Sequence, residues 1–230
     1  MSAPEPGSAA PLLAEDVVLL LFDPSSGTIA GEGTLFYLLG GALLAELALL
    51  GLARTEDAGF RGTLVHPAGD GPPADALLRS ARDHVAEKPR DVQTVLAAIG
   101  PPLRGPVLDR LVGRGDLTRS TRRTLGLFTS TRLGLGDTGR RAALVQRVRA
   151  VLVDGVEPDP RTAASAALLS ASGALPTLHR EIPWTRPVIA RAAALQQGDW
   201  GAAAAGAAVA RTVTAVVTNA LSVAAVLPRG

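Results

Sequence analysis

Three glycines in the segment GLGDTG have the spacing of a dinucleotide-binding loop. Gly134, Gly136 and Gly139 fit the pattern G-x-G-x-x-G, in which glycines let the backbone approach a pyrophosphate. Asp154 follows at a distance of about 20 residues, where an acid would contact the ribose. However, the preceding run LFTSTRL is interrupted by polar residues and no βαβ unit surrounds it, so the context that the motif requires is missing. We therefore interpret the segment as a glycine-rich loop and expect no nicotinamide or flavin cofactor.

The histidines and cysteines indicate neither a metal site nor a nucleophile. His66, His84 and His179 fall in three separate elements, without a partner at ligand spacing, and the chain contains no cysteine. The absence of cysteine excludes a disulfide framework, a thiolate zinc site and a cysteine nucleophile. The sequence also contains no Walker loop, no H-E-x-x-H and no nucleophile elbow. We therefore expect no catalytic residue and no metal.

Arginine supplies nearly all of the positive charge. The net charge is +2, the pI is about 9.9, and Lys88 is the only lysine. Abundant alanine, arginine, glycine and proline are typical of a GC-rich bacterial genome, and the planar fork of arginine also suits phosphate recognition. The cluster RGDLTRSTRR, Arg114 to Arg123, next to an expected hairpin makes a winged-helix-like nucleic-acid-binding protein the alternative function. The segment GRGDLTRST is too rich in glycine and threonine for a recognition helix, so we expect a basic surface and no nucleic acid.

The hydrophobic pattern predicts one mostly α-helical, compact domain with small peripheral β-hairpins. The tail of residues 1–11 has no basic residue and is interpreted as flexible rather than as a signal peptide, which leaves residues 12–230 as the single domain. Helices are expected over residues 12–23 and 34–53, in several shorter amphipathic segments, and from about Trp200 to Leu227. Hairpins are expected in LARTEDAGFRGTLVHP and in TLGLFTSTRLGLGD, residues 124–137.

Two apolar runs, residues 35–53 and 201–227, approach the length of about 20 residues that a membrane span needs. The first contains Glu46 near its middle and the second contains Arg211. A carboxylate in the middle of a bilayer costs about 2.5–3.5 kcal/mol. We therefore interpret both runs as buried core helices, with Glu46 either at the rim of its helix or paired with an arginine inside the fold.

Several segments, taken together and in this order, resemble the Golgi phosphoprotein 3 family over roughly residues 12–205. They are LLAEDVVLLLFDPSSGTI, GALLAELALLG, LVGRGDLTRSTRRTLGLF, RRAALVQRVRAVLVDG and PDPRTAASAALLSASGAL. The resemblance implies a mostly helical single domain without enzymatic activity. It also implies a peripheral adaptor on the cytosolic face of a membrane, and so a cytoplasmic protein with a membrane-protein client.

Eukaryotic members of the family bind phosphatidylinositol 4-phosphate, and the resemblance places four head-group positions on this chain. Counting back without gaps from Glu46 and Leu111 gives Gly31, Gly40, Pro101 and Arg104 as the lipid-binding positions. Only Arg104 matches the family in residue type, although Phe36 or Tyr37 could replace the family's tryptophan after a shift of the loop. We therefore expect an anionic phospholipid surface as the partner, with the head group left open.

The family's mid-chain hairpin enters membranes and mediates self-association, and residues 124–137 match it. Its apolar residues here are Leu125, Leu127, Phe128, Leu133 and Leu135. Exposed apolar patches usually mark partners, so these residues predict contact with a membrane or with a second copy of the chain. The alternative is a hairpin buried in the fold.

Overall fold

The computed structural model describes residues 10–124, 128–200 and 207–224, and the protein is mostly α-helical with small hairpins, as predicted. The helices are α1 (Leu13–Leu21), α2 (Leu35–Leu49), α3 (Ala76–Glu87), α4 (Val92–Ile99), α5 (Arg104–Gly113), α6 (Arg140–Leu152), α7 (Pro160–Ala171), α8 (Arg186–Gln196) and α9 (Ala207–Ala224). Short 3-10 turns lie at η1 (Glu32–Thr34), η2 (Gly59–Arg61), η3 (Pro101–Leu103) and η4 (Leu175–Leu178).

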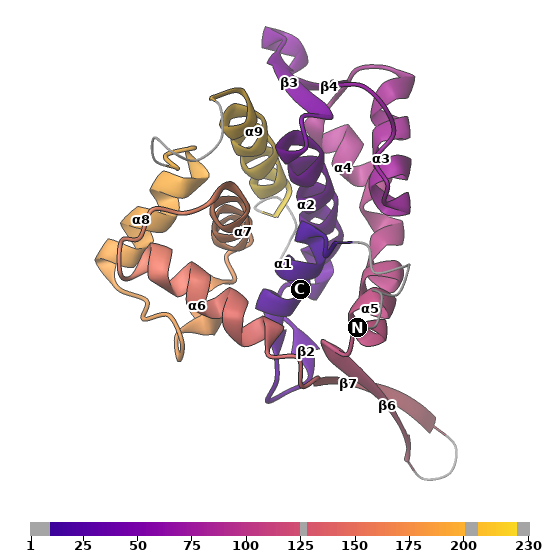
Figure 1. Ribbon diagram of the computed structural model, residues 1–230, viewed down its shortest axis with the longest axis vertical. Helices are drawn as coiled ribbons and strands as arrows, with labels where there is room; N and C mark the ends of the chain where they lie inside the picture. Colours follow the sequence, from indigo (N-terminus) through magenta and orange to yellow (C-terminus); the bar gives the residue numbers. More distant parts are fainter. Residues whose placement is uncertain (1–9, 125–127, 201–206, 225–230) are drawn as a thin grey trace, which may run out of the picture.

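Helix α2 forms the centre of the core. It packs against α1, α4, α7 and α9, and Figure 1 shows it between α7 and α9 on one side and α3 and α5 on the other. A helix that is apolar on all sides must be surrounded in this way. Among the described residues, Glu32–Leu49 is the one helical stretch long and apolar enough to cross a membrane, and 67% of it is buried inside the fold. The burial agrees with the interpretation of this run as a core helix.

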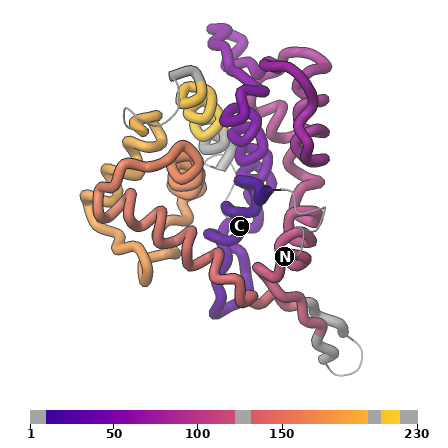
Figure 2. The backbone as a smooth tube through the Cα atoms, in the orientation of Figure 1, coloured from indigo at the N-terminus to yellow at the C-terminus, as the bar shows by residue number. Residues whose placement is uncertain are grey.

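Three small antiparallel sheets lie at the periphery. They are β1 (Phe22–Asp23) with β2 (Thr28–Ile29), β3 (Ala53–Asp57) with β4 (Thr63–Pro67) and β5 (Arg90–Asp91), and β6 (Leu117–Thr124) with β7 (Phe128–Leu135). Figures 1 and 2 show the β3–β4 hairpin at one end of the molecule and the β6–β7 hairpin extending from the opposite end.

The β6–β7 hairpin begins earlier than the sequence predicted. The expected boundaries were 124–137, but β6 starts at Leu117, which pairs with Leu135, and the ladder ends at the pair Thr124–Phe128. Most of the arginine cluster RGDLTRSTRR is therefore a strand rather than a segment before the hairpin. Its threonines favour an extended backbone because their β-branched side chains suit a strand. The missing signal was an apolar face, since residues 118–121 are all exposed.

Two glycines of GLGDTG, Gly136 and Gly139, are required by the backbone. A Cβ atom at position 136 would lie 1.7 Å from the carbonyl oxygen of Gly115, so only glycine allows the end of β7 to approach the chain just before β6. Its N–H donates to the carbonyl of Asp116 at 2.9 Å. Gly139 has a φ of 72° directly before α6, a left-handed conformation that side chains disfavour. The spacing of the motif thus reflects the closure of the hairpin base and the start of the next helix.

Gly136→Ala is expected to destabilise the fold strongly because the added methyl group overlaps the Gly115 carbonyl. We expect a loss of about 3 kcal/mol, or about 6–12 °C in Tm for a chain of this size. Urea and thermal unfolding measure it. Gly105→Ala in α5 is the control, because a Cβ there meets nothing within 4 Å and should cost nothing. Equal stability of the two variants would contradict the close approach.

Candidate functional site

One region rich in charge is a buried network between helices. Its carboxylates are almost completely withdrawn from solvent: Glu15, Asp16, Glu46, Asp75 and Asp116. Buried charges are tolerated only when they are paired and hydrogen-bonded. Each of these carboxylates therefore needs partners inside the fold.

Arg161 of α7 joins α1 and α2. Its guanidinium lies 2.7 Å from a carboxylate oxygen of Asp16, 2.7 Å from one of Glu46, and 2.6 Å from the carbonyl oxygen of Pro11. Glu46 also accepts a hydrogen bond from the N–H of Leu13 in the first turn of α1. Glu46 is therefore paired with an arginine inside the fold, which confirms one of the two sequence interpretations. It also satisfies one of the free N–H groups at the start of α1.

Arg140, the first residue of α6, connects α1 to the base of the β6–β7 hairpin. It lies 2.6 Å from Asp16, 2.7 Å from Asp116 and 3.3 Å from Glu15. Burial alone would lower the pKa of Arg140, but the hydrogen bonds and charges of Asp16 and Asp116 raise it overall. The guanidinium is therefore always charged, and it holds the segments before β6 and after β7 against α1.

Arg110 of α5 extends the network to α3. It makes a two-pronged pair with Asp75, at 2.6 and 3.1 Å, and lies 3.6 Å from Glu15. Asp75 is also the N-cap of α3, where it accepts from the N–H of Leu77 at 2.8 Å. Burial tends to raise the pKa of Asp75, but the hydrogen bonds from Arg110 and Leu77 lower it below its ordinary value of 3.8.

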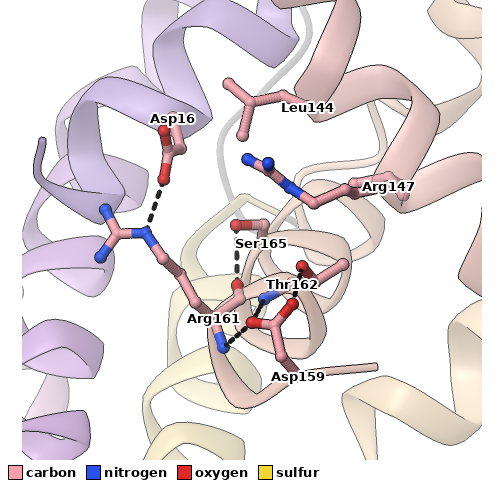
Figure 3. Close-up of a pocket in the computed structure, with 8 residues that line it drawn as sticks. Asp16, Leu144, Arg147, Asp159, Arg161, Thr162 and Ser165 are labelled. Atoms are coloured by element: carbon pink, nitrogen blue, oxygen red, sulfur yellow. Dashed lines mark hydrogen bonds and ion pairs between the residues drawn. The ribbon is translucent and has the colours of Figure 1, made fainter. Parts of the chain in front are cut away.

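A cleft of 290 Å³ opens beside this network, between α1, α6 and α7 (Figure 3). Two acids, Asp16 and Asp159, and two arginines, Arg147 and Arg161, line it, so its charges balance. Asp159 caps α7 through Thr162, and Asp16 pairs with Arg161. Because these polar groups serve helix ends and helix contacts, we assign the cleft to the architecture of the fold.

The second charged region is a pocket of 410 Å³ at the base of the β6–β7 hairpin, here called the hairpin-base pocket. Its lining consists of Gly27, Thr28, Ile29, Glu32, Arg104, Leu108, Arg119 and Leu133. Arg132 does not line the pocket, and its side chain lies against the β1–β2 turn, where a Cβ atom on Gly27 would be 3.3 Å from the Nε of Arg132. The start of α5 and the hairpin thus bring two arginines, Arg104 and Arg119, to one pocket.

Arg104 and Arg119 of the hairpin-base pocket pair with exposed acids. Arg104 forms an ion pair with Glu32, and the Arg119 guanidinium lies 2.9 Å from Asp109. The Arg104 and Glu32 side chains are 50% and 49% exposed, whereas Arg140 and Glu15 of the buried network are 17% and 0% exposed. Exposed ion pairs contribute only about 0–1 kcal/mol. An anion from solution can therefore replace these carboxylates at little cost.

A neighbouring pocket of 280 Å³ shares Glu32 and Arg104 with the hairpin-base pocket. Leu35, Phe36 and Pro101 complete its lining. Phe36 is one of the two aromatic residues that sequence reasoning considered as a substitute for the family's tryptophan, and its ring lies 4.1 Å from that of Tyr37. The pocket therefore has an aromatic wall facing an arginine.

The four head-group positions taken from the family are not all in one place. Pro101 and Arg104 line the smaller pocket, and Gly31 directly precedes Glu32, with a φ of 70°. Gly40 instead lies inside the core, where a Cβ atom would be 3.3 Å from the carbonyl oxygen of Leu96 in α4. Within the described residues, Gly40 thus belongs to the contact between α2 and α4 and lines neither pocket.

The apolar residues of the hairpin are only partly described. Leu133 is half-buried and lines the hairpin-base pocket, and Leu135 is 43% exposed. Leu125 and Leu127 lie outside the described residues, and so does the side chain of Phe128. The insertion of this hairpin into a membrane stays a prediction.

Sequence reasoning missed the convergence of Arg119 with Arg104. Arg119 was assigned only to a basic surface, because the start of the hairpin was placed too late. With the observed register, Arg119 pairs with Leu133 and Arg132 with Ser120. The alternation of side chains along β6 could have shown that Leu117 and Arg119 share one face. Among the described residues there is no group of three or more acids and histidines that could hold a metal ion.

A protein-family model described as Golgi phosphoprotein 3 (GPP34) matches residues 13–212 of the chain. That range includes the buried network and the whole of the hairpin-base pocket. The family is not known as an enzyme family. No curated protein matches the chain.

Arg161→Met is expected to lower the free energy of unfolding by about 3 kcal/mol, because it leaves the buried Asp16 and Glu46 carboxylates short of a partner. Chemical denaturation at neutral pH measures the loss. The control is Arg149→Met, which removes an exposed pair with Asp154 and should change stability by less than about 0.5 kcal/mol. Similar, small losses of unfolding free energy in both variants would show that the network contributes little to stability.

Asp75→Asn is expected to lower stability at neutral pH and to lose this effect in acid. The folded-state pKa of Asp75 is lowered, so its contribution is fully present above the unfolded pKa of about 4 and disappears as the pH falls through the folded value. Asparagine keeps the helix cap, so the variant isolates the charge. Denaturation from neutral pH down to about pH 3 should show the difference from the unmodified chain shrinking below about pH 4. A constant difference would show that the charge of Asp75 is not involved.

Proposed function

Because this chain belongs to the Golgi phosphoprotein 3 (GPP34) family, we propose that it is a non-enzymatic peripheral protein that binds anionic phospholipid membranes. The observation that carries the proposal is the presence of Arg104 and Arg119 in one pocket, at the base of a hairpin that extends from the helical body. In the proposed binding mode, the end of the protein with the β6–β7 hairpin faces the lipid, on the cytosolic side of the membrane.

The strength of the interaction follows from the exposure of these arginines. Each basic residue near an anionic surface contributes about 1 kcal/mol, and salt screens that attraction over about 8–10 Å. Arg104, Arg119 and the apolar residues of the hairpin together support reversible association rather than insertion. This suits an adaptor that holds a client membrane protein and associates with itself through the 124–137 segment.

The head-group preference is proposed to be weak. Phosphatidylinositol 4-phosphate is the ligand that the family resemblance implies, but Gly31, Gly40 and Pro101 have no side-chain donor for a phosphate. Only Arg104 matches the family in residue type, and its guanidinium is already paired with Glu32. Binding should therefore follow the total negative charge of the membrane.

Flotation with liposomes tests the function. Vesicles of phosphatidylcholine alone, and with added anionic lipid, are compared at low and high salt, beside a mobility-shift assay with nonspecific DNA. We expect flotation only with anionic vesicles, release by salt, and no DNA shift. A DNA shift without flotation would instead favour the winged-helix-like alternative.

Arg104→Ala is expected to weaken binding to anionic vesicles about fivefold, no more than Arg119→Ala, because each removes one charge worth about 1 kcal/mol. The matched control is Arg54→Ala, which removes the same charge from β3 at the opposite end of the molecule and should leave binding unchanged. Vesicle co-sedimentation across a lipid titration gives the affinities. If Arg104→Ala alone abolishes binding to vesicles with phosphatidylinositol 4-phosphate, while other anionic vesicles bind weakly, the unselective mode is wrong.

A further inference from the structure

The ion pair between Glu32 and Arg104 lies where the two pockets at the hairpin end meet. Both residues line the hairpin-base pocket and the smaller pocket beside it. On the basis of the proposed function, we propose that Glu32 is an internal competitor for lipid phosphate: its carboxylate holds the Arg104 guanidinium and thereby keeps the protein unselective for head groups.

The local backbone places Glu32 in this position. Gly31 has a left-handed conformation with a φ of 70°, which turns the chain just before η1, and the Thr34 hydroxyl donates to the Gly31 carbonyl at 3.2 Å. The turn directs Glu32 across to Arg104, which is 72 residues further along the chain. The pair therefore depends on a turn that is fixed independently of any ligand.

The exposure of the pair distinguishes competition from structural support. About half of each side chain is open to solvent, whereas the Glu46 carboxylate that pairs with Arg161 is 10% exposed. An exposed pair contributes little to folding and exchanges readily with other anions. A phosphate and a carboxylate use the same forked face of a guanidinium, so they exclude one another there.

The competition selects against one class of ligand more than another. The Glu32 carboxylate also repels any anion that approaches Arg104, and it repels a singly charged phosphodiester less than a doubly charged ligand. A phosphomonoester has up to two negative charges and three terminal oxygens, and Arg104 and Arg119 line the same pocket. Removal of Glu32 should therefore favour doubly charged phosphates, whether they are phosphomonoester head groups of a lipid or free inorganic phosphate.

The test compares Glu32→Gln with Glu56→Gln. Both changes remove one exposed carboxylate, but Glu56 lies on β3 and pairs with Arg54. Binding is measured to phosphatidylcholine vesicles with phosphatidic acid, a phosphomonoester, or phosphatidylglycerol, a phosphodiester, at equal negative charge. We expect Glu32→Gln to bind phosphatidic acid vesicles about tenfold more tightly than the unmodified chain, against about twofold for phosphatidylglycerol. Glu56→Gln should change both affinities equally and by less than about twofold.

A second change locates the effect. In the double variant Glu32→Gln with Arg104→Gln, the selective gain should disappear, because the guanidinium that Glu32 blocks is gone. Thermal unfolding of each variant establishes that it folds. Equal behaviour of Glu32→Gln and Glu56→Gln on both vesicles would overturn the proposal, and so would a gain that persists without Arg104.

The outcomes also separate this proposal from the proposed function. If the unmodified chain binds both vesicles and Glu32→Gln adds no selectivity, the competition is wrong and membrane binding stands. If the unmodified chain binds neither vesicle but Glu32→Gln binds phosphatidic acid, the competition stands and the function as proposed fails. Calorimetry with inorganic phosphate gives the source: a gain on phosphatidic acid vesicles together with tight binding of free phosphate by Glu32→Gln would show that the site recognises phosphate itself, whereas a gain on these vesicles alone would show that it requires the lipid.

Discussion

The pairing of buried carboxylates with the arginines of α6 and α7 is the constraint on which the rest of the structure depends. Arg161 ties α7 to both core helices α1 and α2, and Arg140 ties α1 to Asp116. Asp116 stands just before β6 and Arg140 just after β7, so one ion pair holds both ends of the hairpin. Buried ion pairs are a weak source of net stability, yet removing one partner is costly. Their effect here is to permit one arrangement of the helices and one exit point for the hairpin.

The same chemistry has a different consequence at the hairpin end, because burial differs. In the network, the acids are buried, so an anion from solution cannot replace them. Their arginines therefore stay paired within the fold. At the hairpin base, Arg104 and Arg119 have acids that are about half or more exposed. Since solvent and ions reach them, these guanidiniums remain available to a ligand. Burial, rather than the residue types, thus separates the architectural arginines from those that can recognise an anion.

Much of the fold could be predicted from sequence, because local apolar patterns and residues typical of helix ends indicate helices. For the charge in the middle of the α2 run, pairing with an arginine was one of two interpretations, and the structure supplies that arginine in Arg161. The start of the hairpin was predicted too late, because residues 118–121 of β6 are all exposed and give no apolar pattern. In addition, Gly136 was interpreted as a loop residue, whereas it allows two backbone segments to approach closely. The pocket could not be predicted, since it depends on strand register and on a turn that brings Glu32 to Arg104 across 72 residues.

The construction of the hairpin-base pocket suits the reversible membrane binding that we propose. Its backbone is held from three directions by the β1–β2 turn, the start of α5 and the base of the hairpin, where a Cβ on Gly27 would lie 2.6 Å from the carbonyl oxygen of Leu133. A rigid frame lowers the ordering cost of binding. The guanidinium ends nevertheless stay in water and already have acidic neighbours, so each new contact replaces an old one. In the proposed function, a fixed frame with exchangeable charges would give an interaction that depends on the charge density of the membrane, and the loss of Glu32 would turn this frame toward phosphomonoester head groups.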